Sequence, residues 1–309
     1  QINIKKRLRK KNWSKNMIKK GIILAGGLGT RMSPLTKAVN KQLLPIHDKP
    51  LIFYPLSVLM LAGIKNILII VNKGQLLDFR KILPEKNHLG ITIEYLEQKT
   101  PGGLPEAFII GKKFIGKDNI ALILGDNFFY GQSLGKKLED SIKLKNGARV
   151  FLHPVKNPHL YGIASINNKN KIIKIVEKPT NTKSNLAITG LYFFDNLVVE
   201  FAEKLRPSKR KELEITDLLN KYRKKNKLKA EFIGRGGTWL DTGSIEDFNN
   251  TSNFVSTIEN RQGLKIACLE EIALRKNWID KNKIKKAISF YGKCEYSEYL
   301  KKIQNLKNL

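Results

Sequence analysis

Short apolar runs alternate with longer stretches of helical periodicity through the first half of the chain. The runs are four to six residues long, rich in Ile and Leu, and end at residues that break strands. We predict strands at 22–25, 67–71, 91–96 and 120–124, and helices at 51–62, 76–82 and 106–114. Strands that alternate with helices in this way indicate a mainly parallel sheet covered by helices.

The second half is less regular. We predict strands at 148–154, 161–166, 172–177, 187–194 and 229–233, and helices at 196–205 and 213–224. From residue 245 onward the pattern is helical, with breaks near Gly263, Trp278 and Gly292. The chain contains no internal repeat and no linker that clearly divides it into independent domains.

Composition is that of a globular protein with a strong excess of positive charge. Of the 309 residues, 41% are hydrophobic, which excludes a chain disordered by composition, and the formal net charge is +30. Residues 1–16 hold seven basic residues and no acid, and we interpret them as a disordered extension. Together with 204–229 and 260–309 they account for +22 of the charge, which favours lysine-rich surface over one binding stripe.

Other features of composition narrow the classes further. Two cysteines, Cys268 and Cys294, form neither a disulfide framework nor a metal cage and favour a reducing compartment. No window approaches the roughly 18 apolar residues of a membrane span. A basic protein invites a nucleic-acid function, but no aromatic residues interleave with the basic stretches as single-strand binding requires, so we expect neither nucleic acid nor membrane as a partner.

A glycine-rich loop follows the first predicted strand, with the sequence Ala25-Gly26-Gly27-Leu28-Gly29-Thr30-Arg31. Glycines there allow backbone N–H groups to approach phosphate oxygens. The loop is neither a Walker A motif nor a dinucleotide fingerprint, because no Gly-Lys-Ser/Thr closes it and Met32 stands where the third glycine belongs. A plain tight turn is the alternative. Arg31 and Lys41 favour phosphate, since together they would neutralise a triphosphate.

Longer motifs resemble the sugar-1-phosphate nucleotidylyltransferases. The chain reads Gly-Ile-Ile-Leu-Ala-Gly-Gly-Leu-Gly-Thr-Arg-Met-x-Pro-x-Thr from Gly21 and Lys-Gln-Leu-Leu-Pro-Ile-x-Asp-Lys-Pro from Lys41. With Leu-Gly-Asp-Asn ending at Asn127 and a later Tyr-Gly, it is most similar to the glucose-1-phosphate thymidylyltransferase group of that family. The resemblance extends from about residue 17 to about residue 300.

The resemblance implies a doubly wound, Rossmann-like α/β core with a mainly parallel mixed sheet, a smaller sugar-binding part and a helical C-terminal region. We expect the nucleotidyltransferase domain at 17–245, with a nucleotide-binding part at about 17–130 and a sugar-binding part at about 131–245, and the helical region at 246–309. The implied reaction joins α-D-glucose 1-phosphate to dTTP with Mg²⁺, giving dTDP-glucose and pyrophosphate. A cytoplasmic homotetramer that acts in dTDP-L-rhamnose synthesis and is inhibited by dTDP-rhamnose is also implied.

Two carboxylates are candidates for the metal. Asp126 follows a predicted strand directly, at the sheet edge where ligands bind in open α/β folds, although an Asp in a turn is the alternative. Asp241 lies far downstream in Thr-Trp-Leu-Asp-Thr-Gly. Carboxylate oxygens are ligands that Mg²⁺ prefers. That Asp126 and Asp241 act as a pair is implied only by the resemblance, because spacing does not join residues so far apart.

The resemblance also assigns the sugar and base contacts. Glu177 with Lys178 is an ordinary surface pair by itself, but the family pattern implies that Glu177 accepts bonds from sugar hydroxyls and Lys178 neutralises the sugar phosphate. The matching sugar-binding positions are Asn127, Gly162, Glu177, Lys178 and Ile188. The matching nucleotide positions are Gly26, Gly27, Gly29, Thr30, Arg31, Lys41, Gln42, Gln98, Gly103 and Asp126, with Gln98 and Gly103 at the thymine.

The chain departs from the family in two places. The usual segment Pro-Ser-Pro-Asp-Gly-Leu-Ala-Gln-Ala is here Lys-Thr-Pro-Gly-Gly-Leu-Pro-Glu-Ala, over 99–107, where Pro105 suits a first helical turn. Leu28 stands where Ser is common. Both changes bear on the base and phosphate contacts, so a uridylyltransferase that makes UDP-glucose is the main alternative.

The expected mechanism is direct, in-line attack of the sugar phosphate on the α-phosphorus of dTTP. Arg31, Lys41, Asp126 and Lys178 are the expected catalytic residues, acting by positioning and charge neutralisation. A non-enzymatic regulatory relative is a further alternative, but it should have lost one of the motif residues, and Arg31, Lys41, Asp126 and Asp241 are all present.

Overall fold

The computed structural model describes residues 17–27 and 29–305 and divides into two compact units. The expected extension at 1–16, and Leu28, lie outside the described residues. Unit 1 contains the chain up to Ile22, Gly102–Leu122 and Gln132–Gly237, and unit 2 contains Ile23–Pro101, Ile123–Gly131 and Thr238–Leu309. Each unit is therefore assembled from separate stretches of sequence.

Unit 2 contains the parallel part of the central sheet. β4 (Asn66–Asn72) pairs in parallel with β5 (Thr92–Gln98), and the strand order is β6 (Ile120–Leu124), β1 (Lys20–Ala25), β4, β5. β1 and β6 begin in unit 1 and end in unit 2. The middle five residues of β4 are all buried, which explains its continuous apolar run. α3 (Leu76–Ile82) returns the chain from β4 to β5.

Small sheets and a buried helix complete the centre of unit 2. α2 (Phe53–Leu61) is buried over eight of its nine residues, so it is apolar all round rather than amphipathic. It follows the short pair β2 (Pro45–Ile46) and β3 (Lys49–Pro50) and contacts β7 (Asn127–Gly131). β7 pairs with β13 (Gly237–Asp241). The aromatic rings of Tyr54 and Phe128 lie 5.4 Å apart in this core.

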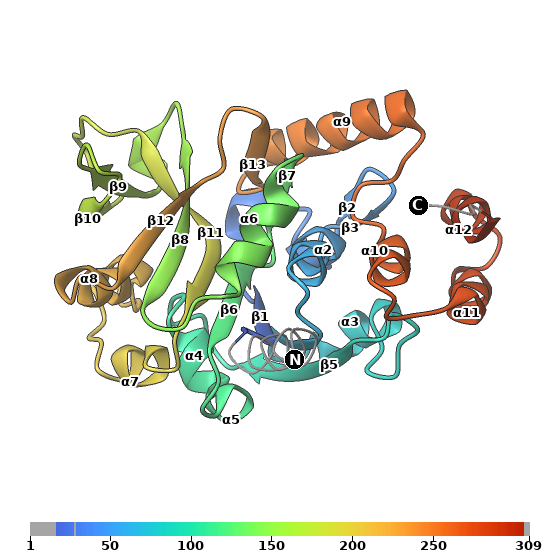
Figure 1. Cartoon of the computed structure of the whole chain (residues 1–309), viewed down its shortest axis with the longest axis horizontal. Helices are drawn as coiled ribbons and strands as arrows, with labels where there is room; N and C mark the ends of the chain where they lie inside the picture. Colours follow the sequence, from blue (N-terminus) through green and yellow to red (C-terminus); the bar gives the residue numbers. More distant parts are fainter. Residues whose placement is uncertain (1–16, 28, 306–309) are drawn as a thin grey trace, which may run out of the picture. The chain divides into compact units, whose positions relative to one another are not determined.

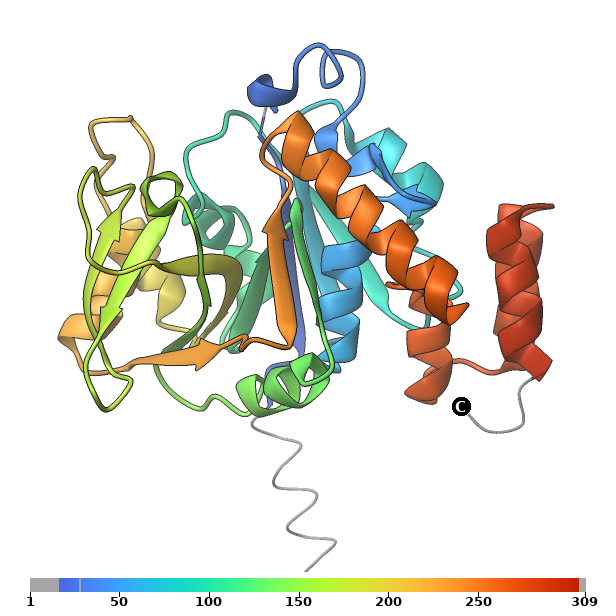
Figure 2. The ribbon, with the colours of Figure 1, turned by 90° about the horizontal axis from the view of Figure 1, so that it is seen from above.

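The C-terminal region is helical, as predicted. It comprises α9 (Ile245–Gln262), α10 (Leu269–Arg275), α11 (Lys281–Tyr291) and α12 (Glu295–Asn305), and α11 lies beside α12 (Figure 1). α9 starts at a Ser244 cap, whose hydroxyl accepts from Asp247 N, ends at Gly263 and contacts β2. Figure 2 shows α9 continuing directly from β13.

Unit 1 contains the antiparallel part of the sheet. β10 (Ile172–Glu177), β9 (Gly162–Ile166) and β11 (Leu186–Phe194) are antiparallel neighbours, β8 (Ala148–Pro154) pairs with β11, and β12 (Leu228–Phe232) pairs in parallel with β8. The helices of unit 1 are α4 (Glu106–Ile110), α5 (Lys112–Ile115), α6 (Leu134–Ser141), α7 (Val198–Glu203) and α8 (Ile215–Lys224).

The predicted fold class, an α/β fold with a mixed, mainly parallel central sheet and flanking helices, is confirmed. Four predicted elements have the observed bounds: β6, β8, β10 and α3. The helix predicted at 106–114 is wrong as one element, because Gly111 separates α4 from α5. Sequence reasoning missed α6 and the short pairs β2–β3 and β7–β13.

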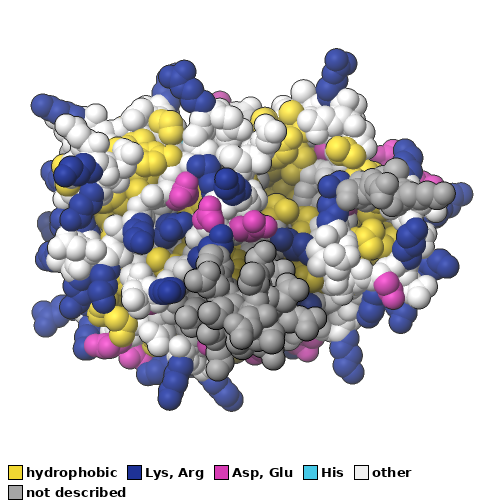
Figure 3. Space-filling model, viewed as in Figure 1, with side chains coloured by type: hydrophobic (Ala, Val, Ile, Leu, Met, Phe, Trp, Pro, Cys, Tyr) yellow, Lys and Arg dark blue, Asp and Glu magenta, His cyan; other side chains and the backbone are white. Residues whose placement is uncertain are grey.

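Charge is dispersed on the face seen in Figure 3. Lys and Arg side chains are scattered over it and do not gather into one stripe, which agrees with the surface interpretation of the +30. No helix among residues 17–27 and 29–305 is long and apolar enough to cross a membrane. Cys268 is buried, Cys294 is exposed, and both are free.

Candidate functional site

The glycine loop leaves β1 in unit 2 and is shaped by close packing. A Cβ atom at Gly26 would lie 2.5 Å from Gln98 Oε1, so any other residue there would displace the Gln98 amide. Gly27 and Gly29 have φ angles of 101° and 59°, a region that glycine adopts without strain. Thr30 and Arg31 follow in a short 3₁₀ turn and are exposed.

Lys41 and Asp126 form an ion pair at the end of β6. Lys41 begins a 3₁₀ turn capped by Asn40, and its side chain is only 8% exposed, whereas that of Asp126 is 28% exposed. Lys41 Nζ lies 2.8 Å from Asp126 Oδ2. Asn127 Nδ2 donates to Asp126 Oδ1 over 2.9 Å, and Trp239 Nε1 donates to Asn127 Oδ1 over 2.6 Å. Trp239 on β13 therefore fixes the orientation of the Asn127 amide, and this amide in turn orients the Asp126 carboxylate.

The electrostatics keep Asp126 ionised. Burial by itself raises its pKa, but the charge of Lys41 and the hydrogen bonds from Lys41 and Asn127 outweigh burial and lower the pKa below the usual value. A carboxylate has about four lone-pair positions, and those two hydrogen bonds use two of them. The ionised, partly exposed carboxylate of Asp126 thus has lone pairs with which it could bind a metal ion.

Asp241 lies in the same unit, next to Arg31. A Cβ atom at Gly243 would lie 3.1 Å from Asp241 Oδ2 and 3.3 Å from Arg31 Nη1, so both side chains lie close to this glycine. The peptide between Asp241 and Gly243 is also fixed to the turn after β6, since Thr242 N and its hydroxyl donate to Asp126 O over 3.1 and 2.9 Å. The backbone thereby brings the two predicted metal carboxylates to neighbouring positions.

Two glutamines line the same part of unit 2. Gln42 is 3% exposed, and its Oε1 is a buried acceptor without a hydrogen-bond partner among the described residues. An orphaned buried acceptor is costly, and a ligand donor would satisfy it. Gln98 is also 3% exposed and is the last residue of β5. Both were predicted as nucleotide contacts.

Unit 1 brings together most of the predicted sugar residues. Glu177 ends β10, and its register partner on β9 is Gly162, where a Cβ atom would lie 3.2 Å from Glu177 Oε2. Lys178 follows with φ 40°, a strained angle for a side-chain-bearing residue, and its N–H donates to Tyr161 O. Ile188 lies on β11, where the β8–β11 register shifts, and is 6% exposed.

Arg210 is a cation that the sequence reasoning missed. Its Nη2 lies 2.6 Å from Glu214 Oε2 and 3.5 Å from Glu177 Oε1. Burial and the neighbouring Glu214 charge raise the pKa of Glu177, and the charges of Arg210 and Lys178 only partly oppose this. The Arg210–Glu214 spacing of four residues was the available signal, but such pairs are common on helix surfaces. Glu177 is thus surrounded by charge on several sides.

Gly103 belongs to unit 1 and is held against backbone. Its φ is 100°, and a Cβ atom there would lie 2.2 Å from Leu213 O. Leu213 N donates to Gly102 O over 2.8 Å, which fixes the loop that precedes α4. Of the predicted nucleotide residues, Gly103 is the one that does not belong to unit 2, and of the sugar residues Asn127 is the one that does not belong to unit 1.

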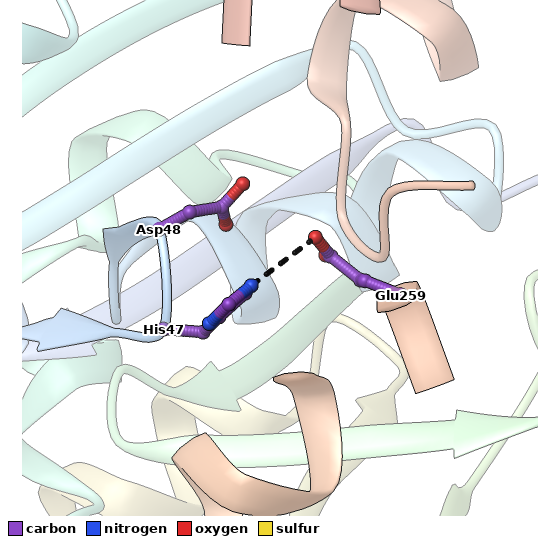
Figure 4. Close-up of side chains that lie close together, drawn as sticks. All are labelled: His47, Asp48 and Glu259. Atoms are coloured by element: carbon purple, nitrogen blue, oxygen red, sulfur yellow. Dashed lines mark ion pairs between the residues drawn. The ribbon is translucent and has the colours of Figure 1, made fainter. Parts of the chain in front are cut away.

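Another group of potential metal ligands occurs elsewhere in unit 2. One ligand atom each from His47, Asp48 and Glu259 lie within 4.8 Å of one another, and Figure 4 shows His47 directed toward Glu259. However, Lys49 and Lys265 bind both carboxylates, and their charges hold the pKa of Asp48 down although burial alone would raise it. Two ammonium groups already neutralise this cluster, which disfavours a divalent cation there.

Comparisons with known proteins found a family model and several similar chains. Residues 20–258 match the family model described as nucleotidyl transferase. The chain is 49% identical over 281 residues to a Neisseria meningitidis serogroup A protein named glucose-1-phosphate thymidylyltransferase, covering 91% of this chain and 98% of that one.

Two solved structures are also similar. A Bacillus anthracis protein in complex with a sucrose has a TM-score of 0.71 and 37% identity, over 76% of this chain and 94% of that one. A UDP-glucose pyrophosphorylase complexed with UDP-glucose has a TM-score of 0.69 and 29% identity, over 78% of this chain and 100% of that one.

Proposed function

The chain belongs to the nucleotidyl transferase family, and we infer that it transfers a thymidylyl group from dTTP to α-D-glucose 1-phosphate. The products are dTDP-glucose and pyrophosphate. The observation that carries this inference is the Lys41–Asp126–Asn127 group beside the glycine loop, in a chain 49% identical to a named glucose-1-phosphate thymidylyltransferase. We further propose that the product enters dTDP-L-rhamnose synthesis.

The reaction needs positioning and charge more than covalent participation of the protein. An oxygen of glucose 1-phosphate attacks the α-phosphorus of dTTP, a new P–O bond forms, and the bond to the β-phosphate breaks with its electrons leaving on pyrophosphate. The attacking oxygen is already ionised near neutral pH, so no general base is required. Holding both reactants in line supplies much of the rate.

We propose that cationic side chains divide the phosphates between them. Arg31 and Lys41 would stabilise the departing pyrophosphate, and Lys178 would hold the sugar phosphate. Arg210, which lies 3.5 Å from Glu177, would add a second cation on the sugar side. The glycine loop, with Gly26, Gly27, Gly29 and Thr30, would receive the phosphates.

A divalent metal is general for this family, and we propose Mg²⁺ held by Asp126 and Asp241. Both are hard oxygen donors, and Asp126 is ionised, partly exposed and has lone pairs to spare, so the residues fit the ion. When bound, Mg²⁺ neutralises charge on the phosphate oxygens. Asn127 then orients Asp126 through the 2.9 Å hydrogen bond described above.

The sugar and base contacts are proposals of the same kind. Glu177 would accept hydrogen bonds from sugar hydroxyls, with Asn127, Gly162 and Ile188 around the ring. Gln98 and Gly103 would read thymine, and Gln42 would accept from the nucleotide, which would satisfy its orphaned Oε1. UDP-glucose synthesis is the less supported alternative, since the UDP-glucose enzyme is 29% identical against 49% for the thymidylyltransferase.

Assembly, regulation and location are inferred from the resemblance alone. We propose a homotetramer that acts in the cytoplasm and is inhibited by dTDP-rhamnose. The sequence boundaries at 17–130, 131–245 and 246–309 likewise stay a prediction about function, since the two units combine the chain differently. Light scattering during size-exclusion chromatography would measure the assembly.

The decisive experiment compares dTTP with UTP as the nucleotide. Pyrophosphate release is measured with each, at saturating glucose 1-phosphate, with Mg²⁺ and with EDTA in its place. We expect kcat/KM to be at least about tenfold higher for dTTP, a difference of about 1.4 kcal/mol, and EDTA to abolish turnover. Faster turnover with UTP would show that the protein is a uridylyltransferase instead. Turnover in EDTA would show that the reaction does not need the proposed metal.

A further inference from the structure

Asn72 lies beside the proposed nucleotide site, although no motif drew attention to it. It is the last residue of β4, the strand next to β1, and its register partner on the parallel strand β5 is Gln98. Parallel strands end together at one edge of the sheet, so Asn72 and Gln98 come to that edge side by side. A Cβ atom at Gly26 would lie 2.5 Å from Gln98 Oε1 and 3.3 Å from Asn72 Oδ1.

The amide of Asn72 binds the backbone of Gly27 twice. Gly27 N donates to Asn72 Oδ1 over 3.0 Å, and Asn72 Nδ2 donates to Gly27 O over 2.9 Å. The side chain therefore imitates a paired strand and satisfies both polar groups of one peptide residue. Gly27 has φ 101°, so this double contact fixes the loop where it turns away from the strand.

A second amide side chain, that of Asn40, restrains the chain before and after this turn. Asn40 Nδ2 donates to Ala25 O over 3.2 Å and to Gln75 Oε1 over 2.5 Å, and Asn40 Oδ1 accepts from Gln42 N over 2.8 Å. Ala25 precedes the turn, and Gln42 follows Lys41. Asn40 thus fixes both chain segments that carry the proposed phosphate contacts, while Asn72 alone, among these amides, binds Gly27.

We propose that Asn72 is a positioning residue for the nucleoside triphosphate: its amide fixes the Gly26–Gly27 turn in the conformation that receives the phosphates. This rests on the proposed function. Because the Gly27 N–H is already bound to Asn72, the contribution of Gly27 is to direct the loop toward Gly29, Thr30 and Arg31 rather than to donate to phosphate itself. Glucose 1-phosphate has no contact with this turn in the proposal, so its binding should be indifferent to Asn72.

The test is a KM comparison in the full chain with Asn72→Ala. Loss of both hydrogen bonds frees the turn, and we expect KM for dTTP to rise about tenfold while KM for glucose 1-phosphate changes less than about twofold. Asn72→Thr offers one hydroxyl in place of the amide and suits a strand, so a smaller rise in KM for dTTP is expected. It also serves as the test variant if Asn72→Ala fails to fold.

Asn87→Ala is the matched control. Asn87 also binds backbone with its amide, donating to Glu85 O and Ile91 O and accepting from Leu89 N, but at the opposite end of β5. Its loss should lower the melting temperature and leave both KM values unchanged. If the Asn72 variants behave like Asn87→Ala, or if both KM values rise together, the positioning role is overturned.

The outcome also separates this proposal from the proposed function. If the unaltered protein releases no pyrophosphate from dTTP, the function is wrong whatever the variants do. If it is active and KM for dTTP is unchanged in folded Asn72→Ala and Asn72→Thr, only the role of Asn72 is wrong. Calorimetric titration with Mg-dTTP gives the same comparison without turnover. We expect the Kd of Asn72→Ala for Mg-dTTP to be about tenfold larger than that of the unaltered protein.

Discussion

Gly162 illustrates how a single residue sets the sugar side. It carries no positive φ, so its glycine is required by space rather than by backbone conformation. A Cβ atom there would lie 2.9 Å from Thr216 Cγ2 and 3.2 Å from Glu177 Oε2. The first distance is shorter than real Cβ contacts, so the Thr216 side chain, β9 or α8 would have to shift, and the second distance crowds the Glu177 carboxylate.

Gly162→Ala should therefore weaken capture of glucose 1-phosphate. We expect KM for glucose 1-phosphate to rise about tenfold, because a displacement near 1 Å at a substrate-positioning group has effects of this size or larger, while KM for dTTP stays within about twofold. Initial-rate kinetics with each substrate varied in turn would measure both.

Gly135→Ala supplies the control at a glycine with open space. Nothing lies within 4 Å of its Cβ position in α6, so alanine should stabilise that helix by about 0.5–1 kcal/mol and leave both KM values unchanged. Equal KM values for Gly162→Ala and the unaltered protein would show that Glu177 is not constrained at this glycine.

The segment before α4 shows an effect at the scale of an element. The family usually has Asp and Gln at the positions of Gly102 and Glu106. Here Glu106 Oε2 accepts from Gly102 N over 2.8 Å, and a Cβ atom at Gly102 would lie 2.7 Å from the same oxygen. The carboxylate has thus moved from the loop to the first turn of the helix, where it also suits the helix dipole.

The two departures should be coupled. Gly102→Asp alone places a second carboxylate against Glu106 and should lower the free energy of unfolding by about 1 kcal/mol. Adding Glu106→Gln removes the repulsion and should recover most of that loss. Urea denaturation of the two single variants and the double variant measures the coupling, and strictly additive changes would contradict it.

At the scale of the whole molecule, the C-terminal helices are joined to the sheet side of unit 2 by a buried carboxylate. Glu270 on α10 has a fully buried side chain and accepts from His88 Nε2 over 2.7 Å, from Tyr291 over 2.9 Å and from Tyr296 over 2.6 Å. Burial by itself raises the pKa of Glu270, but the hydrogen bonds from His88 and Tyr296 outweigh it, so the pKa is lowered.

Glu270→Gln should destabilise the protein by about 3 kcal/mol near neutral pH, since charge-assisted hydrogen bonds contribute most and the amide brings donors against donors. Because the pKa of Glu270 is lower in the folded state, its ionised form stabilises the fold above pH 4.5, the usual value for Glu. This stabilisation is lost as the pH falls from 4.5 through the lowered pKa of the folded state. The variant should therefore lose less stability than the unaltered protein as pH falls below 4.5. Urea denaturation at a series of pH values measures both.

Glu298→Gln is the control for this change. Glu298 is 57% exposed and pairs with Lys301 on the surface of α12, so its loss should change the free energy of unfolding by less than about 0.5 kcal/mol. Parallel pH profiles for Glu270→Gln and the unaltered protein would show that the buried carboxylate does not titrate with folding.

Local pattern was sufficient for elements that carry a clear apolar run or helical period between breakers. β6, β8, β10 and α3 agree with their predicted bounds because apolar runs and breakers are local signals. β7 and β13 were missed, since each is stabilised by a partner more than a hundred residues away. For the same reason spacing alone did not join Asp126 to Asp241, although motif resemblance did.

By itself, the sequence determined the family, the α/β class and the identity of the candidate site residues. Long ordered motifs and strand-length apolar runs can be recognised from the order of residues alone. Tertiary structure alone decided which side chains meet. It joined Lys41 to Asp126, Arg210 to Glu177 and Asn72 to Gly27. Hydrogen bonds and ion pairs act over about 3 Å of space, and a linear sequence contains no record of that distance until the chain has folded.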